Sequence, residues 1–198
     1  MLTERREKFK KVEIVIGKIF SKVPLSPNQY TTISIFFALL SFYSLSQKKL
    51  LLSLIFFLAA GFLDLIDGAV ARMSGRATKR GAFLDTIFDR YVDGIVLLGF
   101  LFLELPSFIL PAKMWIFLAL FGGFATTYAK AAAKEKGLVQ EELKTALLGR
   151  AERAILIYGA MILGIFSVNW AIYPIIILAI LSNISALQRI YSALTTSH

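Results

Sequence analysis

Long apolar runs are the feature that most restricts what this chain can fold into. Six of them can be placed, at residues 28–46, 50–71, 82–104, 109–132, 145–167 and 169–192. About 20 apolar residues in a helix are enough to cross the hydrocarbon core of a bilayer. Soluble domains are about 45–50% apolar, whereas this chain is 57% hydrophobic. We therefore expect an all-α integral membrane protein with six transmembrane helices.

The basic residues predict how these helices are oriented. Only three of the 22 Lys and Arg residues, Lys48, Lys49 and Lys113, fall on one side of the predicted topology. The others precede the first run, lie around the second and fourth connections, or follow near the end of the last run. Because cytoplasmic loops carry the excess of basic residues, we expect a protein of the cell membrane with both termini in the cytoplasm.

Residues 3–23 form a separate amphipathic pattern. Apolar residues recur there at steps of three and four, while Lys and Arg occupy the opposite face of the helix. The apolar set is Phe9, Val12, Ile16, Ile19, Phe20 and Val23. Two interpretations stay open: an interfacial helix anchored on an anionic leaflet, or a helix packed on its own bundle. The simplest organisation is one membrane domain over residues 1–198, with the six-helix bundle at 28–192.

Every aspartate of the chain lies in one predicted helical hairpin. The five residues are Asp64, Asp67, Asp85, Asp89 and Asp93. Asp64 and Asp67 are three residues apart, so they share a helical face. On the next helix Gly81 and the remaining three aspartates step by four and form a second stripe. If the two helices run antiparallel, the two stripes can face each other at the predicted cytoplasmic end.

The negative charge of such a cluster must be offset by positive charge. A carboxylate within a membrane costs about 2.5–3.5 kcal/mol on insertion scales, and several of them repel one another. Hard divalent cations take oxygen ligands and can offset that charge. Helix capping and a cation pathway are the alternatives, although capping does not explain a four-residue stripe.

Small residues lie beside the aspartates. Gly68 and Ala71 leave a shallow patch that a flat ring could approach, unless they serve helix packing. Arg72 can bind a phosphate.

The hairpin resembles the signature of a known family. The pattern Asp64-x-x-Asp67-Gly68-x-x-Ala71-Arg72, then eight residues, then Gly81-x-x-x-Asp85-x-x-x-Asp89 is similar to that of the CDP-alcohol phosphotransferases. The resemblance implies a six-span fold, and transfer of a substituted phosphate from a CDP-alcohol, usually a CDP-lipid, to a hydroxyl with release of CMP. It also implies a homodimer.

The resemblance assigns roles to individual residues. Two divalent cations, Mg²⁺ or Mn²⁺, would be held by Asp64, Asp67, Asp85 and Asp89. Asp89 would also be the catalytic general base. The CDP-lipid would be bound by Asn28, Thr31, Asp64, Asp67, Gly68, Ala71, Arg72, Gly81 and Asp85. Membrane lipids are expected partners, and a nucleic acid is not.

Basic residues outside the hairpin point to the acceptor. Lys130, Arg150, Arg153 and Arg189 all fall on the predicted cytoplasmic side. Spacing alone leaves two interpretations open: ordinary positive-inside residues, or a cup for a phosphate on the acceptor. The segments around them resemble the inositol-phosphate branch of the family, which includes phosphatidylinositol and archaetidylinositol phosphate synthases. Ala132 and Gly149 depart from that branch, and Asp93 would contact the polyol.

These observations predict transfer of a phosphatidyl or archaetidyl group from a CDP-lipid to myo-inositol 1-phosphate, at a site facing the cytoplasm. Glycerol 3-phosphate and serine are the alternative acceptors within the family. A cation-coupled transporter is the alternative from another class. It would explain aspartates in a membrane, but it would not explain Gly68, Ala71 and Gly81 at fixed spacing.

Overall fold

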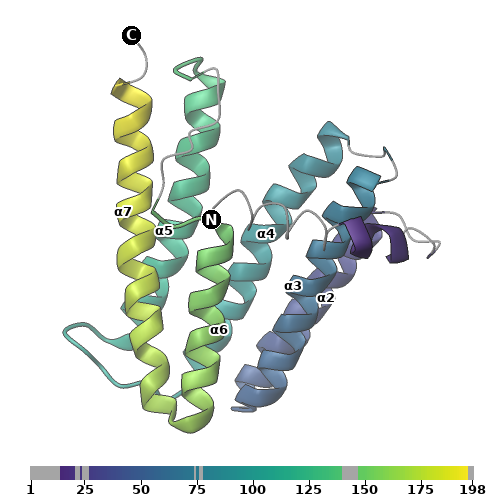
Figure 1. Ribbon diagram of the computed structural model, residues 1–198. Helices are drawn as coiled ribbons and strands as arrows, with labels where there is room; N and C mark the ends of the chain where they lie inside the picture. The colour runs from purple at the N-terminus through teal and green to yellow at the C-terminus, as the bar shows by residue number, and fades with distance from the viewer. Residues whose placement is uncertain are drawn as a thin grey trace, which may run out of the picture. The chain divides into compact units, whose positions relative to one another are not determined.

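The computed structural model describes residues 14–20, 23, 27–73, 75, 78–139 and 147–195, except the side chains of residues 27 and 28. The long helices are α2 Pro27–Ser46, α3 Leu50–Met73, α4 Lys79–Gly99, α5 Ala112–Glu135, α6 Arg150–Phe166 and α7 Ile172–Thr195 (Figure 1). Short 3₁₀ turns, η1 Phe100–Phe102 and η2 Val168–Ala171, adjoin α4 and α7. Within these residues the only β-pairing is an isolated bridge between Phe108 and Leu110. The predicted all-α class is confirmed.

The helices lie where the apolar runs predict them, and local hydrogen bonds explain their ends. The α4 helix begins three residues before the predicted run because Thr78 caps it: the Thr78 Oγ1 accepts a hydrogen bond from the Gly81 N–H at 3.0 Å. The turn after α2 is closed by Lys48, whose φ of 58° is left-handed. Its N–H donates to the Leu45 carbonyl, and the Lys49 N–H donates to the Ser44 carbonyl, both at 2.8 Å.

Among the described residues, three segments are long and apolar enough to cross a membrane: Leu50–Met73, Ala112–Glu135 and Val168–Thr195. The other three long helices differ from them in length or polarity. The α6 helix has only 17 residues, about 25 Å at 1.5 Å per residue. The α4 helix carries the acidic stripe together with Lys79, Arg80 and Arg90. Crossing by all six helices therefore stays a prediction.

The chain divides into two compact units. The first comprises residues 1–41 and 55–96, and the second comprises residues 42–54 and 97–198. Helices α2, α3 and α4 each contribute residues to both units. A single membrane domain stays a prediction, and the two units are described separately below.

In the first unit, the helical residues 14–20 pack on α2 and α3. Ile16 and Phe20 lie against a buried cluster of Tyr30, Ile66 and Val70. Ile14, Val15 and Ile19 remain exposed. Part of the predicted amphipathic helix therefore packs on its own bundle, as one of the two interpretations requires. Residues 3–13 and 21–22 lie outside the described residues, so the full helix and its membrane anchoring stay a prediction.

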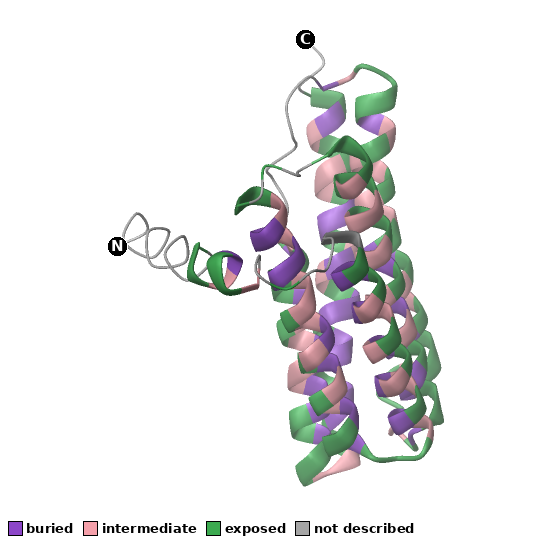
Figure 2. Ribbon diagram, turned by 90° about the vertical axis from the view of Figure 1, so that its right-hand side faces the viewer, coloured by how far each residue is buried: buried purple, intermediate pink, exposed green. Residues whose placement is uncertain are grey.

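In the second unit, α7 packs against both α5 and α6, and buried residues recur along these helices (Figure 2). Gly122 permits the close approach of α5 to α7, since a Cβ there would lie 2.8 Å from the Asn183 backbone nitrogen. The Thr126 hydroxyl lies 3.1 Å from the Ser182 carbonyl as well as 2.6 Å from the Gly122 carbonyl. Small residues and interhelical hydrogen bonds are the usual means of packing helices in membranes.

Candidate functional site

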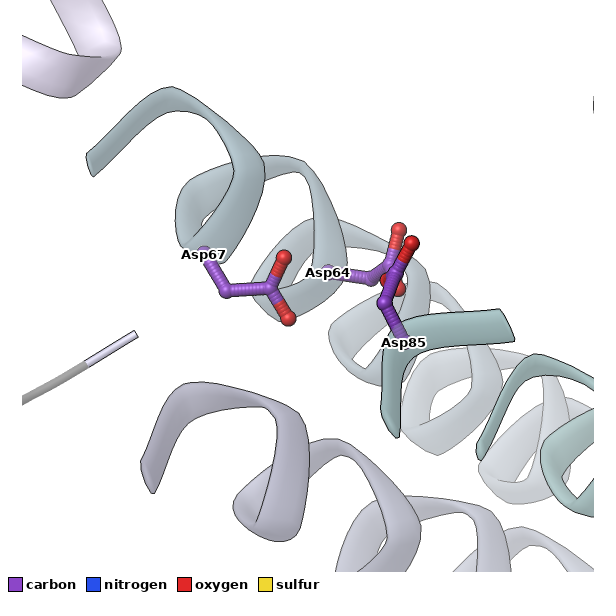
Figure 3. A group of neighbouring side chains, drawn as sticks. All are labelled: Asp64, Asp67 and Asp85. Atoms are coloured by element: carbon purple, nitrogen blue, oxygen red, sulfur yellow. The ribbon is translucent and has the colours of Figure 1, made fainter. Parts of the chain in front are cut away.

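Two consecutive helices of the first unit bring three carboxylates together. Asp64 and Asp67 come from α3 and Asp85 comes from the second turn of α4. Each offers an oxygen, and these oxygens all lie within 4.8 Å of one another. Figure 3 shows the carboxylates of Asp64 and Asp85 side by side, with that of Asp67 pointing toward them. The predicted meeting of the two stripes is confirmed for these three residues.

The geometry suits a hard divalent cation. Ca²⁺ and Mg²⁺ bind oxygen at about 2.0–2.6 Å, so ligands on opposite sides of an ion lie about 4–5 Å apart. The three carboxylate oxygens, none more than 4.8 Å from another, are close enough to bind one such ion. Asp67 is 6% exposed, and Asp64 and Asp85 are partly buried. Three anionic groups at this separation repel one another strongly unless a cation lies between them.

A hydroxyl from a third helix fixes one of the three carboxylates. The Thr31 Oγ1, on the second turn of α2, donates a hydrogen bond to the Asp67 Oδ2 at 2.7 Å. Both residues are buried, each 6% exposed. Thr31 was expected to contact the donor, whereas this bond links it directly to a predicted metal ligand. The side chain of Asn28 lies outside the described residues.

The predicted donor residues adjoin the carboxylates along the same two helices. Gly68 leaves space for Arg72 one turn on, since a Cβ on Gly68 would lie 3.0 Å from the Arg72 Nη2. Arg72 is exposed and Ala71 is partly buried. Gly81 lies on the first turn of α4, one turn before Asp85. The structure therefore places a cationic side chain and small residues next to the acidic cluster.

The last two aspartates of the stripe, Asp89 and Asp93, lie beside a buried arginine. Arg90 is 6% exposed, and its guanidinium lies 3.3 Å from an Asp93 oxygen and 3.9 Å from an Asp89 oxygen. Asp89 follows Asp85 by one turn of α4 and is not among the three clustered residues. Arg90 was not among the predicted site residues. Its position between two aspartates of the stripe was the signal available.

In the second unit, hydrogen bonds bring the predicted acceptor residues toward one end. The Arg189 guanidinium, on α7, donates to the Thr126 carbonyl of α5 at 3.0 Å. Lys130 lies one turn further along α5, and both residues are partly buried. Because the carbonyl of residue 126 and the N–H of residue 130 belong to the same helical turn, Lys130 and Arg189 lie at the same level of the α5–α7 pair.

The start of α6 is held at that level as well. The Leu147 N–H donates to the Gln188 Oε1 at 3.1 Å, and the Leu148 N–H donates to the Ser185 Oγ at 3.0 Å. These bonds place Arg150, the first residue of α6, beside the turn of α7 that carries Arg189. Arg153 is buried, 7% exposed, and Arg150 is exposed.

Gly149, a departure from the branch, lies beside the exposed side chain of Glu152. A Cβ at this position would lie 2.6 Å from the Glu152 Oε2. Gly149 therefore leaves space for the Glu152 carboxylate at the first turn of α6, where a negative charge is favoured by the helix dipole.

Comparisons with known proteins agree with this geometry. The model of a family described as CDP-alcohol phosphatidyltransferase matches residues 24–184. Archaetidylinositol phosphate synthase of Pyrococcus horikoshii is 33% identical over 193 residues, which cover 98% of this chain and 96% of the relative.

Solved structures of Mycobacterium tuberculosis phosphatidylinositol phosphate synthase have a similar fold. The structure with CDP-DAG bound has a TM-score of 0.78 at 25% identity and covers 93% of this chain and 94% of the other. A structure of the same enzyme in complex with manganese and citrate also has a TM-score of 0.78 at 25% identity, with 92% and 89% coverage.

Proposed function

Because the chain belongs to the CDP-alcohol phosphatidyltransferase family, we propose that it transfers a phosphatidyl or archaetidyl group from a CDP-lipid to inositol phosphate and releases CMP. The reaction class follows from the family. The choice of acceptor is supported by the relatives named as inositol phosphate synthases. The observation that carries it in this chain is the convergence of Arg189, Lys130 and the start of α6 at one end of the second unit.

The cofactors proposed are two divalent cations, Mg²⁺ or Mn²⁺, held by Asp64, Asp67, Asp85 and Asp89. The clustered carboxylates support this assignment, as does the manganese in the similar mycobacterial enzyme. When bound, such ions polarise the diphosphate and stabilise the charge of the leaving CMP. Gly68, Ala71, Gly81, Asn28 and Thr31 line the nucleotide site, and Arg72 contacts the diphosphate.

Asp89 is the proposed catalytic base. A base must reach the proton of the acceptor hydroxyl while that oxygen attacks the phosphorus in line with the departing CMP oxygen. Asp89 lies one turn beyond the clustered carboxylates on α4 and beside the Arg90 guanidinium. Its role as the base is the one that the resemblance to the family implies. The acceptor hydroxyl then loses its proton to Asp89 as the new phosphorus–oxygen bond forms and the bond to CMP breaks.

The acceptor phosphate is bound by Lys130, Arg150, Arg153 and Arg189. Guanidinium groups suit this task because each presents a planar pair of donors to phosphate oxygens. Arg153 is nearly buried, so a contact from it would be screened little by solvent. Asp93, ion-paired with Arg90, contacts the polyol hydroxyls.

The proposed setting is the cell membrane, with six crossings, the active site and both termini on the cytoplasmic side, and two chains in a homodimer. The N-terminal helix lies at the membrane surface. Exposed apolar residues Ile14, Val15 and Ile19 support that placement, because they give the helix an apolar face that the bundle does not cover.

The experiment that tests the proposed function is CMP release from a CDP-lipid against a panel of acceptors. Both diacyl and archaeol donors are tested with inositol phosphate, free inositol, glycerol 3-phosphate and serine. Inositol phosphate should give the highest kcat/KM with at least one donor. A preference for serine or glycerol 3-phosphate would assign another acceptor within the family. Cation movement across vesicles without any CMP release would instead indicate a transporter.

A further inference from the structure

The hydrogen bond between Thr31 and Asp67 stands out among the contacts of the first unit. It joins residues 36 positions apart, from α2 to α3, with a length of 2.7 Å between two buried side chains. A threonine hydroxyl carries one hydrogen, and here that hydrogen is directed to the Asp67 Oδ2. A hydroxyl–carboxylate bond of this length is charge-assisted and stronger than a neutral one.

This bond restricts how Asp67 can turn. The carboxylate has two oxygens, and holding Oδ2 against α2 fixes the plane of the group and the direction of its remaining lone pairs. Asp67 is also one of the three carboxylates that approach within 4.8 Å of each other. Repulsion from Asp64 and Asp85 favours rotation of the Asp67 carboxylate away from them. The hydroxyl therefore opposes that rotation before any cation is present.

We propose that Thr31 is a positioning residue for the metal site: its hydroxyl holds Asp67 in the orientation that binds a divalent cation. This inference rests on the proposed function only for the identity of the cation. It gives Thr31 a role beyond lining the nucleotide site. Its primary effect is on metal affinity, and an effect on donor binding follows from the metal.

A neighbouring serine provides a matched control. Ser34 lies on the same buried face of α2, one turn from Thr31, and its Oγ donates to the Thr31 carbonyl at 2.7 Å. It is 2% exposed. Ser34→Ala therefore removes a buried hydroxyl and a hydrogen bond from the same helix without removing the donor to Asp67. Its effect measures the general cost of losing a buried polar contact in α2.

The test compares Thr31→Val, Thr31→Ser and Ser34→Ala in the full-length protein. Binding of Mn²⁺ is measured by the loss of the free-ion electron paramagnetic resonance signal, without CDP-lipid or acceptor. Removing a group that orients a metal ligand typically costs about 10- to 100-fold in metal affinity, so Thr31→Val should bind Mn²⁺ more weakly by that factor. Thr31→Ser, which keeps the hydroxyl, and Ser34→Ala should both bind within about threefold of the unmodified protein, below that range.

Two results would overturn the inference. One is unchanged Mn²⁺ affinity in Thr31→Val, whether or not CDP-lipid binding at saturating metal falls. The other is an equal loss in Thr31→Val and Thr31→Ser, because the side-chain methyl would then be the important group. If Thr31→Val does not fold, Thr31→Cys replaces it, and its weaker donor should give a measurable but smaller loss. Metal binding is measured without substrate, so its result does not depend on CMP release. Failure of the unmodified protein to release CMP would refute the proposed function but not this inference.

Discussion

The acidic region of the first unit and the basic region of the second are built in different ways. The acidic region uses two consecutive helices: helical spacing places Asp64 and Asp67 on one face of α3, and the packing of α4 against α3 brings Asp85 to them. The basic region draws Lys130, Arg150 and Arg189 from three helices. Bonds involving backbone groups hold the turns of α5, α6 and α7 that carry these residues at one level. A local spacing pattern marks the residues of the first region in the sequence, whereas the residues of the second share no such pattern and are brought together only by tertiary contacts.

The two regions also have opposite electrostatic needs. Clustered carboxylates bind cations and, through them, a diphosphate, whereas clustered Arg and Lys bind an anion directly. If this division is correct, changes in the acidic region should alter metal binding and turnover. Changes in the basic region should alter only the use of the acceptor.

Removal of metal should have the largest effect. Without divalent cations the donor diphosphate would meet the clustered carboxylates unscreened, so EDTA should abolish CMP release and weaken CDP-lipid binding. Excess Mg²⁺ or Mn²⁺ should restore both. Turnover by the EDTA-treated protein at the metal-replete rate would remove the cations from the mechanism.

Asp89→Asn should come next. The substitution keeps the size of the side chain but removes the proposed base. Turnover should fall by about 10²- to 10⁴-fold, the usual contribution of a positioned base, while CDP-lipid still binds when metal is present. Single-turnover kinetics with saturating donor would measure this. Turnover within about tenfold of the unmodified enzyme, below that range, would exclude Asp89 from the role.

Arg153→Ala should affect the other region. Loss of one charge-assisted contact is worth about 1.5–3 kcal/mol, which raises the KM for inositol phosphate about 10- to 150-fold. The KM for CDP-lipid should hardly change. Arg153→Lys should also raise the acceptor KM, because an ammonium cannot make the paired contact of a guanidinium.

Lys134→Ala is the matched control for that experiment. Lys134 is exposed on α5, one turn beyond Lys130. It lies on the same predicted cytoplasmic side but is not one of the predicted acceptor residues. An acceptor KM that rises equally in Lys134→Ala and Arg153→Ala would make the effect one of general positive charge. Unchanged acceptor KM values in both variants would mean that Arg153 does not bind the acceptor phosphate and that the basic residues only reflect membrane topology.

The smallest effect is expected at an ion pair that belongs to neither region. The Lys48 Nζ lies 2.6 Å from the Glu104 Oε1, and both side chains are exposed. The hydrogen bond from Lys48, together with its charge, lowers the pKa of Glu104 below the ordinary value of 4.5. A lowered pKa in the folded state contributes stability above the unfolded value, and this contribution is lost as the pH falls through the folded value.

Glu104→Gln should therefore lower Tm slightly at pH 7, and the difference should shrink as the pH falls below 4.5 or as salt is added. Activity should not change. A clear loss of CMP release in this variant would mean that the account places function too narrowly in the acidic and basic regions.

The difference between the regions also explains how much the sequence could predict. Helix positions and the shared face of Asp64 and Asp67 follow from apolar runs and helical spacing, which are local properties. The meeting of these two residues with Asp85 follows once the short connection is taken to make α3 and α4 antiparallel. The bond from Thr31 to Asp67 depends on how α2 packs against α3 and on a side-chain rotamer. The ion pair between Arg90 and Asp93 likewise depends on a rotamer. Neither is contained in a spacing pattern.

The ends of the helices show the same limit. The apolar run that contains α4 extends to residue 104, but the helix ends at Gly99 and passes into η1. Apolar composition continues through both, so the run cannot mark the change. In the basic region the partner of Arg189 is a backbone carbonyl, and any residue type at position 126 would supply one.

The most direct test of the division between the two regions is the preference of the unmodified enzyme for inositol phosphate over free inositol. It is measured as the ratio of kcat/KM for CMP release at saturating CDP-lipid. If the basic region binds the acceptor phosphate, this ratio should be at least about 10, because each charge-assisted contact is worth about 1.5–3 kcal/mol. Arg189→Ala should lower that ratio while donor binding is unchanged. Equal use of the two acceptors by the unmodified enzyme would contradict the account, because the basic region would then have no phosphate to bind.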